Sequence, residues 1–431
     1  MRVLHVTSTF PRAPGDATGP FLADLVAASR AAGLEVRVVA PNGAGVVPMD
    51  GVRRFRYGPA RAEVLAYGGG LLAASRGAGA VMVPAYVGAM AQAGVAEARA
   101  WRPDIVHAHW WLPGGLVGLA AGRAAHAPVV ITLHGSDVGL ARRVRPLARA
   151  VARRAAAVTA VSGALAAEAS ELLGVHVTVT AMPVVVGDLF AVAGDPFVAD
   201  PAAVVDLSVV GDPSAVVDLS GGVDPSAADP SAAADASVGA ADPSLGAAAR
   251  LGGGLVAVGR LVPEKGFDVL IDALRLAPRP LTIVGAGPLE GALRARAVGL
   301  DVTFAGVLGR SALHALIARA AAVVVPSRRE GLGLVAVEAI LLGTPVVASF
   351  TGGLPEALGA FDAPPPAYGE VVEVAGGLLV PPDHVGALAA ALARVATLGP
   401  PGPMAVAGAA RHRPEAVAAH HLALYRSLLA R

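Results

Sequence analysis

The chain has 431 residues and a formal net charge of +1, and aromatic residues make up 4% of it. This length leaves room for two domains with full hydrophobic cores, whereas the near-neutral charge and the few aromatic side chains argue against a nucleic-acid-binding surface. Cysteine is absent, which excludes disulfides, zinc–thiolate sites and a thiol nucleophile, and the first residues lack the apolar core of a secretory signal, so we expect a cytoplasmic protein.

Short runs rich in β-branched residues alternate with alanine-rich stretches of helical length along the first part of the chain. These runs are apolar almost throughout, as strands covered by helices on both faces must be. They lie at residues 2–8, 35–40, 104–109, 129–135 and 156–162. The alternation predicts a doubly wound, Rossmann-like parallel sheet in a first domain of residues 1–190.

The longest uncharged stretch, residues 77–96, is long enough to cross a bilayer. Gly and Pro interrupt it, and Ala and Gly contribute little to membrane insertion. We interpret the stretch as a buried helix with a loop, and a membrane span is the alternative.

Residues 191–249 differ in character from the rest of the chain. The triplet DPS begins at residues 212, 224, 229 and 242, and AVVDLS occurs twice. A structureless segment of this length is uncommon inside a compact domain. We therefore expect a low-complexity, largely disordered insertion or linker between two domains.

The strand-like runs resume after the insertion. They lie at residues 254–260, 281–287, 302–307, 321–327, 345–349 and 376–382. They predict a second doubly wound sheet in a domain of residues 250–412, so that two α/β domains face each other across a cleft. Residues 413–431 have apolar side chains at helical spacing, which indicates an amphipathic terminal helix that needs a partner surface.

The first candidate site lies at the end of the strand at 254–260. Arg260 directly follows this strand, and Lys265, the sole lysine of the chain, follows in a loop that leads into a helix beginning near Phe267. Two cations beside a helix N-terminus form an anion site, for which a diphosphate is a natural ligand. The alternative is a pair of solvated loop charges.

The segment SRREGLGLVAVEAILLGTPVVAS, residues 327–349, carries the second candidate site. Glu330 ends a loop, Gly331 and Gly333 open a helix, and Glu338 lies two turns inside that helix. Small residues at a helix N-terminus leave N–H groups free for phosphate oxygens, and a carboxylate accepts hydrogen bonds from vicinal hydroxyls. The alternative is a glutamate at the helix N-terminus, favoured by the helix dipole, and an exposed glutamate further along the helix.

Histidines mark the first domain. His134 ends a strand before Gly135, which would turn its ring toward the cleft, although a structural histidine is the alternative. His107 and His109 point to the same face of one strand, but no carboxylate or third histidine stands at ligand spacing for a metal. The chain also lacks Asp-x-Asp, the usual carboxylate clamp for a metal that holds a diphosphate.

Together these motifs resemble the family 4 retaining glycosyltransferases of GT-B fold, also described as glycosyl transferases group 1. The donor-side motifs are GRLVPEKG, IVGAGP, VPSRREGLGLVAVEAILLGTPVVAS and GGLLVPP, and the acceptor-side motifs are TSTFPRAPGDATGPF, PDIVHAHWW and TLHGSD. The resemblance covers the whole chain except the insertion. Two departures stand out: Leu332 occupies the place of a usual Phe, and PVVVGD at 183–188 replaces Pro-Asn-Gly-Val-Asp.

The resemblance implies roles for particular residues. Arg260 and Lys265 would bind the donor diphosphate, and Glu338 would bind the nucleotide ribose. Glu330 and the following amides would bind the transferred sugar, and His134 would touch that sugar near the reaction centre. Gly19 would let the backbone approach the donor phosphate, and the terminal helix would cross back to the first domain. The donor-binding residues implied in this way are Gly19, Gly285, Gly331, Leu332, Gly333, Leu334 and Glu338.

The implied activity is that of a retaining hexosyltransferase that moves a sugar from a UDP- or GDP-sugar to an acceptor hydroxyl without a metal or other cofactor. The alternatives are a nucleotide-sugar 2-epimerase of the same architecture and a non-catalytic sugar-nucleotide binder. The acceptor is a glycan, a lipid-linked compound or a small molecule.

A row of arginines follows the TLHGSD motif. Their spacing of three and four residues predicts one basic stripe on a helix, which is either a solvated face or a contact with an anionic acceptor or a membrane surface. The stripe consists of Arg142, Arg145, Arg149 and Arg153.

Overall fold

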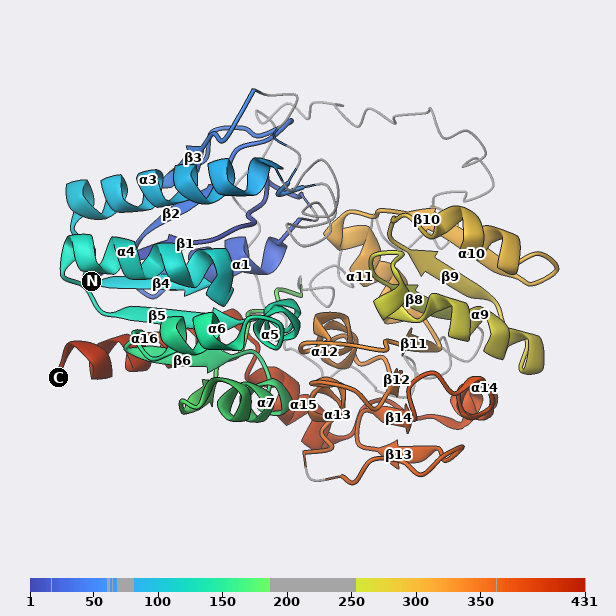
Figure 1. Cartoon of the computed structure of the whole chain (residues 1–431). Coiled ribbons are helices and arrows are strands. Elements are labelled where there is room, and N and C mark those ends of the chain that lie inside the picture. Colours follow the sequence, from blue (N-terminus) through green and yellow to red (C-terminus); the bar gives the residue numbers. More distant parts are fainter. Residues whose placement is uncertain are drawn as a thin grey trace, which may run out of the picture.

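The computed structural model contains two seven-stranded sheets, each with helices on both faces (Figure 1). It describes residues 1–16, 18–59, 63, 65–67, 81–186, 253–361 and 363–430. The proposed insertion at 191–249 lies outside these ranges. All strand pairings in the described ranges are parallel except that of β13 with β14.

The first sheet has the strand order β3-β2-β1-β4-β5-β6-β7. Its strands are β1 (Arg2–Val6), β2 (Glu35–Pro41), β3 (Val52–Phe55), β4 (Ile105–His109), β5 (Val129–Leu133), β6 (Ala157–Ala160) and β7 (Val177–Val179). The helices of this domain are α1 (Pro20–Ala31), α3 (Val83–Trp101), α4 (Leu116–Ala125), α5 (Ser136–Ala141), α6 (Arg145–Ala152) and α7 (Gly163–Leu173), with a π-helical turn, η3, at Trp111–Gly115.

The second sheet has the order β10-β9-β8-β11-β12-β14-β13. Its strands are β8 (Leu255–Val258), β9 (Leu281–Val284), β10 (Val302–Gly306), β11 (Ala322–Val325), β12 (Val346–Ser349), β13 (Val372–Val374) and β14 (Gly377–Val380). Its helices are η6 (Pro263–Lys265), α9 (Phe267–Leu276), α10 (Glu290–Arg296), α11 (Arg310–Arg319), α12 (Leu334–Leu341), α13 (Leu354–Ala357), α14 (Val385–Arg394), η7 (Val395–Thr397), α15 (Pro403–Ala410) and α16 (Pro414–Leu429).

Every strand expected from an apolar run is present, within a few residues of its expected ends, so the α/β fold class is confirmed. The expected strands are apolar because helices cover both faces, and β4, β5, β11 and β12 are buried at every position. The sequence did not indicate β3, β7 and β13, which are short and lie at sheet edges.

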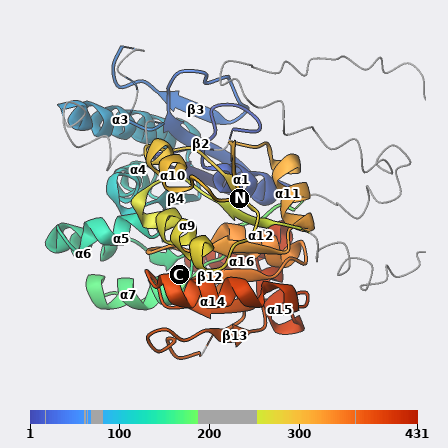
Figure 2. The ribbon, with the colours of Figure 1, turned by 90° about the vertical axis from the view of Figure 1, so that its right-hand side faces the viewer.

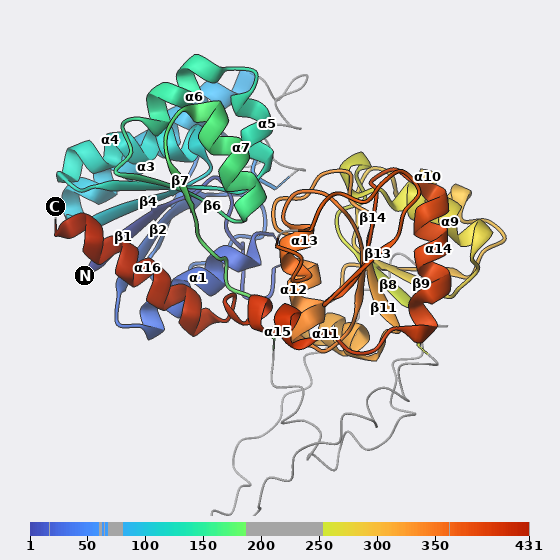
Figure 3. The same cartoon turned by 90° about the horizontal axis from the view of Figure 1, so that it is seen from below.

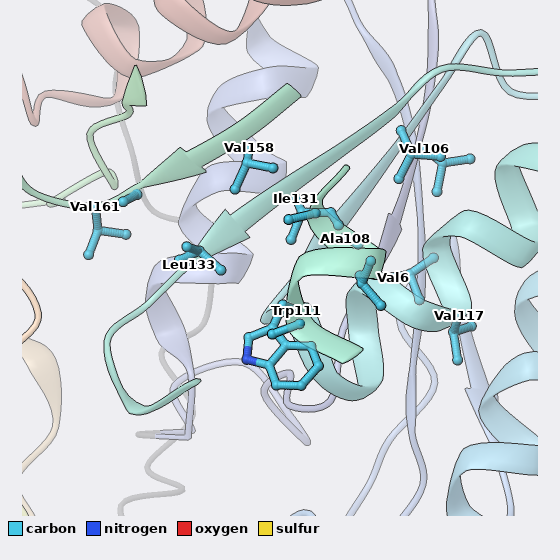
Figure 4. Packing of buried hydrophobic residues seen from close by; sticks show 14 of the residues in the cluster. Val6, Val106, Ala108, Trp111, Val117, Ile131, Leu133, Val158 and Val161 are labelled. Carbon is cyan, nitrogen blue, oxygen red and sulfur yellow. The ribbon is translucent and has the colours of Figure 1, made fainter. Parts of the chain in front are cut away.

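The core of the first domain forms where η3 and α4 pack on the sheet. Trp111, 1% exposed, faces the side chains of Val6, Ala108 and Ile131 (Figure 4). Burying a side chain of this size contributes on the order of 2–3 kcal/mol. This core fixes β4 and β5, from whose ends the candidate site residues of the first domain extend.

Most of the uncharged stretch at 77–96 belongs to α3, whose Tyr86 and Met90 are fully buried in the core of the first domain. Within the described ranges, no helix combines the length and the apolar character that a bilayer crossing requires.

The C-terminal helix α16 leaves the second domain and lies along the first, beside α1 (Figure 3). Its Tyr425 is fully buried and forms a 2.6 Å hydrogen bond with Nδ1 of His107 on β4. Figure 2 looks onto the second domain, with α3 and α4 of the first domain behind α9 and α10. A helix from the end of the chain thus ties the two domains together.

Candidate active site

The two domains contact each other through loops that follow strands of both sheets. Ser162, after β6, donates a 2.7 Å hydrogen bond from Oγ to the carbonyl of Gly331, after β11. A Cβ on Gly331 would lie 2.6 Å from the carbonyl oxygen of His134, after β5. These contacts bring His134 next to the segment from Glu330 to Leu334.

Lys265 and Glu330 form an ion pair at this junction, with 2.6 Å between Nζ and Oε2. Ser327 donates a 3.1 Å hydrogen bond to the same carboxylate oxygen. Gly266 allows the loop after β8 to pack against the loop after β11, because its φ of 66° is left-handed and a Cβ there would lie 2.0 Å from the carbonyl oxygen of Pro326. Because Lys265 is paired with Glu330, a ligand that binds Lys265 shares it with this carboxylate.

The ends of β8 and β9 adjoin this pair. Arg260 directly follows the β8–Gly259 segment and is exposed. Gly285, after β9, packs so closely that a Cβ would lie 2.0 Å from the carbonyl oxygen of Gly259. A Cβ on Gly259 would in turn lie 3.6 Å from Cδ and Cε of Lys265, so the lysine stem runs over this turn.

The segment from Gly331 to Leu334 enters α12. Gly333 has a left-handed φ of 85° and is the N-cap residue of α12. Within the described part of the chain, no group accepts a hydrogen bond from the N–H groups of this segment. Unpaired amides at a helix N-terminus and just before it favour an anion, and they follow Glu330, the partner of Lys265.

Leu332 connects the two domains. Its side chain is 4% exposed and belongs to the core cluster of the first domain, which includes Val161 after β6. The Leu332 side chain therefore anchors the loop against the first domain. A ligand could contact Leu332 only through its backbone amide.

Glu338 lies on α12, and no hydrogen bond to its carboxylate is found in the described ranges. Burial raises its pKa to about 7, with a smaller upward effect from Asp24 and an opposing effect from Arg310. Binding of the ribose hydroxyls by this carboxylate stays a prediction.

Two family models match the chain: the glycosyl transferase 4-like domain at residues 17–184 and glycosyl transferases group 1 at residues 252–397. Both models lie in chain order and together cover most of the described residues. The chain belongs to this glycosyltransferase family.

Relatives and solved structures agree with this assignment. The chain is 30% identical to the glycogen synthase of Mycobacterium tuberculosis over 278 residues, 60% of this chain and 55% of that protein. It is 38% identical to the D-inositol 3-phosphate glycosyltransferase of Jonesia denitrificans over 146 residues, 30% of this chain and 31% of that protein. The chain thus spans about half, or less, of the length of the curated relatives it matches.

The sucrose-phosphate synthase of Thermosynechococcus elongatus has a similar structure, with a TM-score of 0.67, 20% identity and full coverage of both chains. At this identity the likeness concerns the fold. The GT-B fold expected from the sequence is confirmed.

His134 packs against Trp110 and Phe21, with ring centroids 4.5 and 5.3 Å away. Burial lowers its pKa to about 3, so the imidazole is neutral at physiological pH. Nε2 lies 3.2 Å from Nδ1 of His109.

Asp137 is a site residue to which sequence reasoning assigned no role, although it belongs to the TLHGSD motif. Its Oδ1 accepts hydrogen bonds from the backbone N–H groups of His134 and Gly135, at 3.1 and 3.0 Å. It is 2% exposed, and burial raises its pKa to about 6. Asp137 thus fixes the loop that carries His134.

Gly19 is the N-cap residue of α1, with a left-handed φ of 65°. A Cβ there would lie 3.3 Å from Cγ2 of Thr9, so the loop between β1 and α1 is tightly folded. Arg12 and Asp16 in this loop form an ion pair of 2.7 Å, which holds the pKa of Asp16 well below its usual range.

The sequence spacing indicated no third histidine that could join His107 and His109 at a metal, and this expectation is wrong for the folded chain. His5 on β1 joins them, with possible ligand atoms of all three within 4.8 Å of one another. His5 and His107 are register partners on adjacent strands, although 102 positions separate them in sequence. Sequence spacing alone could not indicate this cluster.

The prediction that the four arginines form one stripe on a single helix is also wrong. Arg142 follows the end of α5, and a new helix, α6, begins at Arg145 and contains Arg149. Pro146 favours this break, because proline is best tolerated in the first turn of a helix. Nε of both Arg145 and Arg149 donates to the carbonyl of Leu172 at the end of α7.

Proposed function

We propose that this glycosyltransferase moves a sugar from a nucleotide diphosphate sugar, UDP- or GDP-linked, to an acceptor hydroxyl with retention of configuration. The observation that carries the proposal is the 2.6 Å ion pair between Lys265 and Glu330 beside the N-terminus of α12. It combines a cation for a diphosphate with a carboxylate for sugar hydroxyls at the junction of two domains.

The cations act on the leaving group. In the reaction, the bond between the anomeric carbon and a diphosphate oxygen breaks, and the acceptor oxygen bonds to that carbon from the same face. Negative charge grows on the diphosphate as the bond breaks, and Arg260 and Lys265 stabilise it more in the transition state than in the ground state. The proton of the acceptor hydroxyl passes to the departing diphosphate.

The two glutamates hold the two ends of the donor. Glu338, as a carboxylate, accepts hydrogen bonds from the vicinal hydroxyls of the ribose. Glu330 and the amides of Gly331–Leu334 hold the transferred sugar, and His134 approaches it from the first domain. This division is the one that the family resemblance implies.

The proposed reaction does not require a metal ion. The chain contains no Asp-x-Asp motif, and side-chain cations supply the positive charge that a divalent metal would otherwise contribute. Transfer should therefore persist in EDTA.

A donor screen tests the proposal. The purified chain is incubated with UDP-, GDP- and ADP-sugars in EDTA, with a panel of glycan, lipid-linked and small-molecule acceptors. Release of the nucleoside diphosphate is measured, and the anomeric configuration of the product is read by NMR. An Arg319→Ala variant, changed at an exposed position on α11, serves as the control.

The products also separate the alternatives. Conversion of a sugar nucleotide into an isomer of equal mass without an acceptor would indicate an epimerase. Binding without any turnover would indicate a sugar-nucleotide binder. An inverted product, or turnover that depends on a divalent metal, would contradict the corresponding part of the proposal.

A further inference from the structure

Three histidines form a continuous chain across three neighbouring strands of the first sheet. His5 lies on β1, His109 on β4, and His134 directly after β5. Nδ1 of His5 is 2.9 Å from Nε2 of His109, and Nδ1 of His109 is 3.2 Å from Nε2 of His134. His5 and His109 are buried, whereas His134 is partly exposed at the domain junction.

The rings of the chain lie end to end. The centroids of His5 and His109 are 5.2 Å apart and those of His109 and His134 are 5.4 Å apart. In each pair the centroid separation exceeds the nitrogen separation by about twice the distance from the centre of an imidazole to its nitrogen. The facing nitrogens therefore lie close to the line between the ring centres, which is the geometry of an N–H···N hydrogen bond.

A shared metal ion fits this arrangement less well. Two nitrogens on a tetrahedral zinc would be about 3.3 Å apart, given Zn–N bonds of about 2.0–2.1 Å. The 2.9 Å between His5 and His109 is shorter. His107 has both nitrogens engaged, with Tyr425 and Thr132. Both nitrogens of His109 are engaged within the chain of histidines.

The protons of the chain must be ordered. Burial lowers the pKa of His5 and His134 to about 3 and that of His109 well below its usual value, so all three rings are neutral near pH 7. A neutral imidazole has one N–H, and each hydrogen bond needs one donor and one acceptor. Only two arrangements satisfy both bonds, and they run in opposite directions along the chain.

The environment of His5 selects between them. Its Nε2 is buried and has no hydrogen-bond partner among the residues that the structure describes. His5 also lines a gap together with Thr7, Phe10, Leu22, Val26, Val38 and His109, and this gap is too narrow for a water molecule. A buried N–H without an acceptor is rarer in proteins than an unused acceptor. The proton of His5 is therefore favoured on Nδ1, where it is donated to His109.

We propose that His5 and His109 are positioning residues that fix His134 as the Nδ1–H tautomer, a hydrogen-bond donor at the domain junction. With His5 donating to His109 and His109 donating to Nε2 of His134, Nδ1 of His134 must carry the proton. In the described ranges this nitrogen has no partner, so it is available to a sugar or phosphate oxygen.

The role assigned to this donor rests on the proposed function, since the ligand is the sugar nucleotide. In that reaction His134 donates to a donor oxygen and does not act as the base at Nδ1. This agrees with transfer of the acceptor proton to the departing diphosphate.

The first test reads the tautomer directly. Protein labelled with ¹⁵N-histidine is examined by long-range ¹H–¹⁵N correlation at pH 7, with signals assigned through single histidine-to-glutamine variants. We expect Nδ1 of His134 to be protonated and Nε2 to be an acceptor. A protonated Nε2 on a neutral His134, or a charged His134, would overturn the proposal. Neither result depends on any activity.

The second test uses two variants of similar shape. In His5→Asn the amide nitrogen occupies about the place of Nδ1 and still donates, whereas His5→Leu has no donor. We expect Asn to keep the His134 tautomer and most of kcat. Leu should give mixed tautomers and about a tenfold loss of kcat, with a smaller change in donor KM. Such a loss is smaller than the removal of a whole preorganised donor.

Thermal unfolding separates this role from a structural one. If kcat falls in both variants in proportion to their loss of stability, the chain is only structural and the proposal is overturned. One equivalent of bound metal in the purified protein, whose removal shifts the His5 and His109 signals, would also overturn it. Absence of turnover with every sugar nucleotide contradicts the proposed function instead and leaves the tautomer result intact.

Discussion

Arg310, at the start of α11 in the second domain, forms a two-bond salt bridge with Asp24 on α1 of the first domain. Nη1 and Nη2 lie 3.1 and 2.7 Å from the two carboxylate oxygens. The side chains are 39% and 17% exposed, so the pair contributes only about 0–1 kcal/mol to stability. The two charges also act on Glu338: Arg310 lowers the pKa of its carboxyl group, and Asp24 raises it.

This arrangement predicts opposite effects of the two partners on donor binding. Protonation of Glu338 should weaken donor binding, so the donor KM should rise below the pKa of Glu338. Arg310→Gln removes a cation that lowers this pKa, and the rise in KM should therefore begin at higher pH. Asp24→Asn removes an anion that raises this pKa, and the rise should begin at lower pH. Steady-state kinetics from pH 5.5 to 9 measures both shifts. Shifts in the same direction would contradict the coupling through Glu338.

Glu338 itself should make stability depend on pH. Its pKa rises from 4.5 to about 7 on folding, so between these values the folded state binds a proton that the unfolded state has released. Stability therefore falls as pH rises through this window. Glu338→Gln should unfold at a higher temperature than the wild type at pH 8 and at a similar temperature near pH 5.

The same variant should bind the donor about tenfold more weakly at pH 8, because an amide replaces the carboxylate that accepts from the ribose. Glu415→Gln, at an exposed position on α16, is the matched control and should change neither property. A Glu338→Gln protein that gains no stability at pH 8 would show that the carboxylate is well solvated.

The sequence was sufficient to predict the two sheets and the strand-end loops that carry the candidate site. Buried parallel strands leave continuous apolar runs, and ligands of such sheets bind beyond the carboxyl ends of strands. These two rules place Lys265 and Glu330 on loops of the same sheet edge. The ion pair between them was not predicted, because it depends on the turn at Gly266.

Contacts between distant segments could not be predicted from the sequence. His5 and His109 are 104 residues apart and meet because β1 and β4 are neighbours in the sheet. Leu332 was expected only at a ligand site, whereas its side chain is buried against the first domain. The strand order brings the two histidines together, and the contact between the domains buries Leu332. Neither feature produces a local pattern in the sequence.

Gly331 should be intolerant of any side chain. A Cβ would lie 2.6 Å from the carbonyl oxygen of His134, so Gly331→Ala must shift one loop and separate the domains there. We expect at least a tenfold loss of kcat/KM with little change in thermal stability. Gly291→Ala on α10, where no atom of the described residues lies within 4 Å of the added Cβ, should be neutral or slightly stabilising. Equal activities of the two variants would contradict a tight junction.

The arginines of α6 should act on stability. Nε of Arg149 donates a 3.1 Å hydrogen bond to the carbonyl of Leu172 near the end of α7, so Arg149→Ala should cost about 1 kcal/mol. Thermal unfolding measures this, with Arg319→Ala as the control.

A membrane role for Arg142, Arg145, Arg149 and Arg153 instead requires stronger binding to anionic than to neutral vesicles at low salt. Equal binding to both would contradict that role.

Lys265 provides the sharpest test of the proposed chemistry. Its stem runs over Gly259 and its Nζ lies 2.6 Å from Glu330. If it stabilises the departing diphosphate, its interaction strengthens as charge develops, so Lys265→Ala should lower kcat by about 100- to 1000-fold with a smaller change in donor affinity.

Lys265→Arg keeps the charge but replaces a compact ammonium by a wider planar group. Because the ammonium fits between Glu330 and the Gly259 turn, arginine should leave kcat at least about tenfold below the wild type. Single-turnover kinetics with the preferred donor separates binding from chemistry, and Arg319→Ala controls for loss of a surface charge. An arginine variant with wild-type kcat would show that charge alone, and not the shape of lysine, is required at this position.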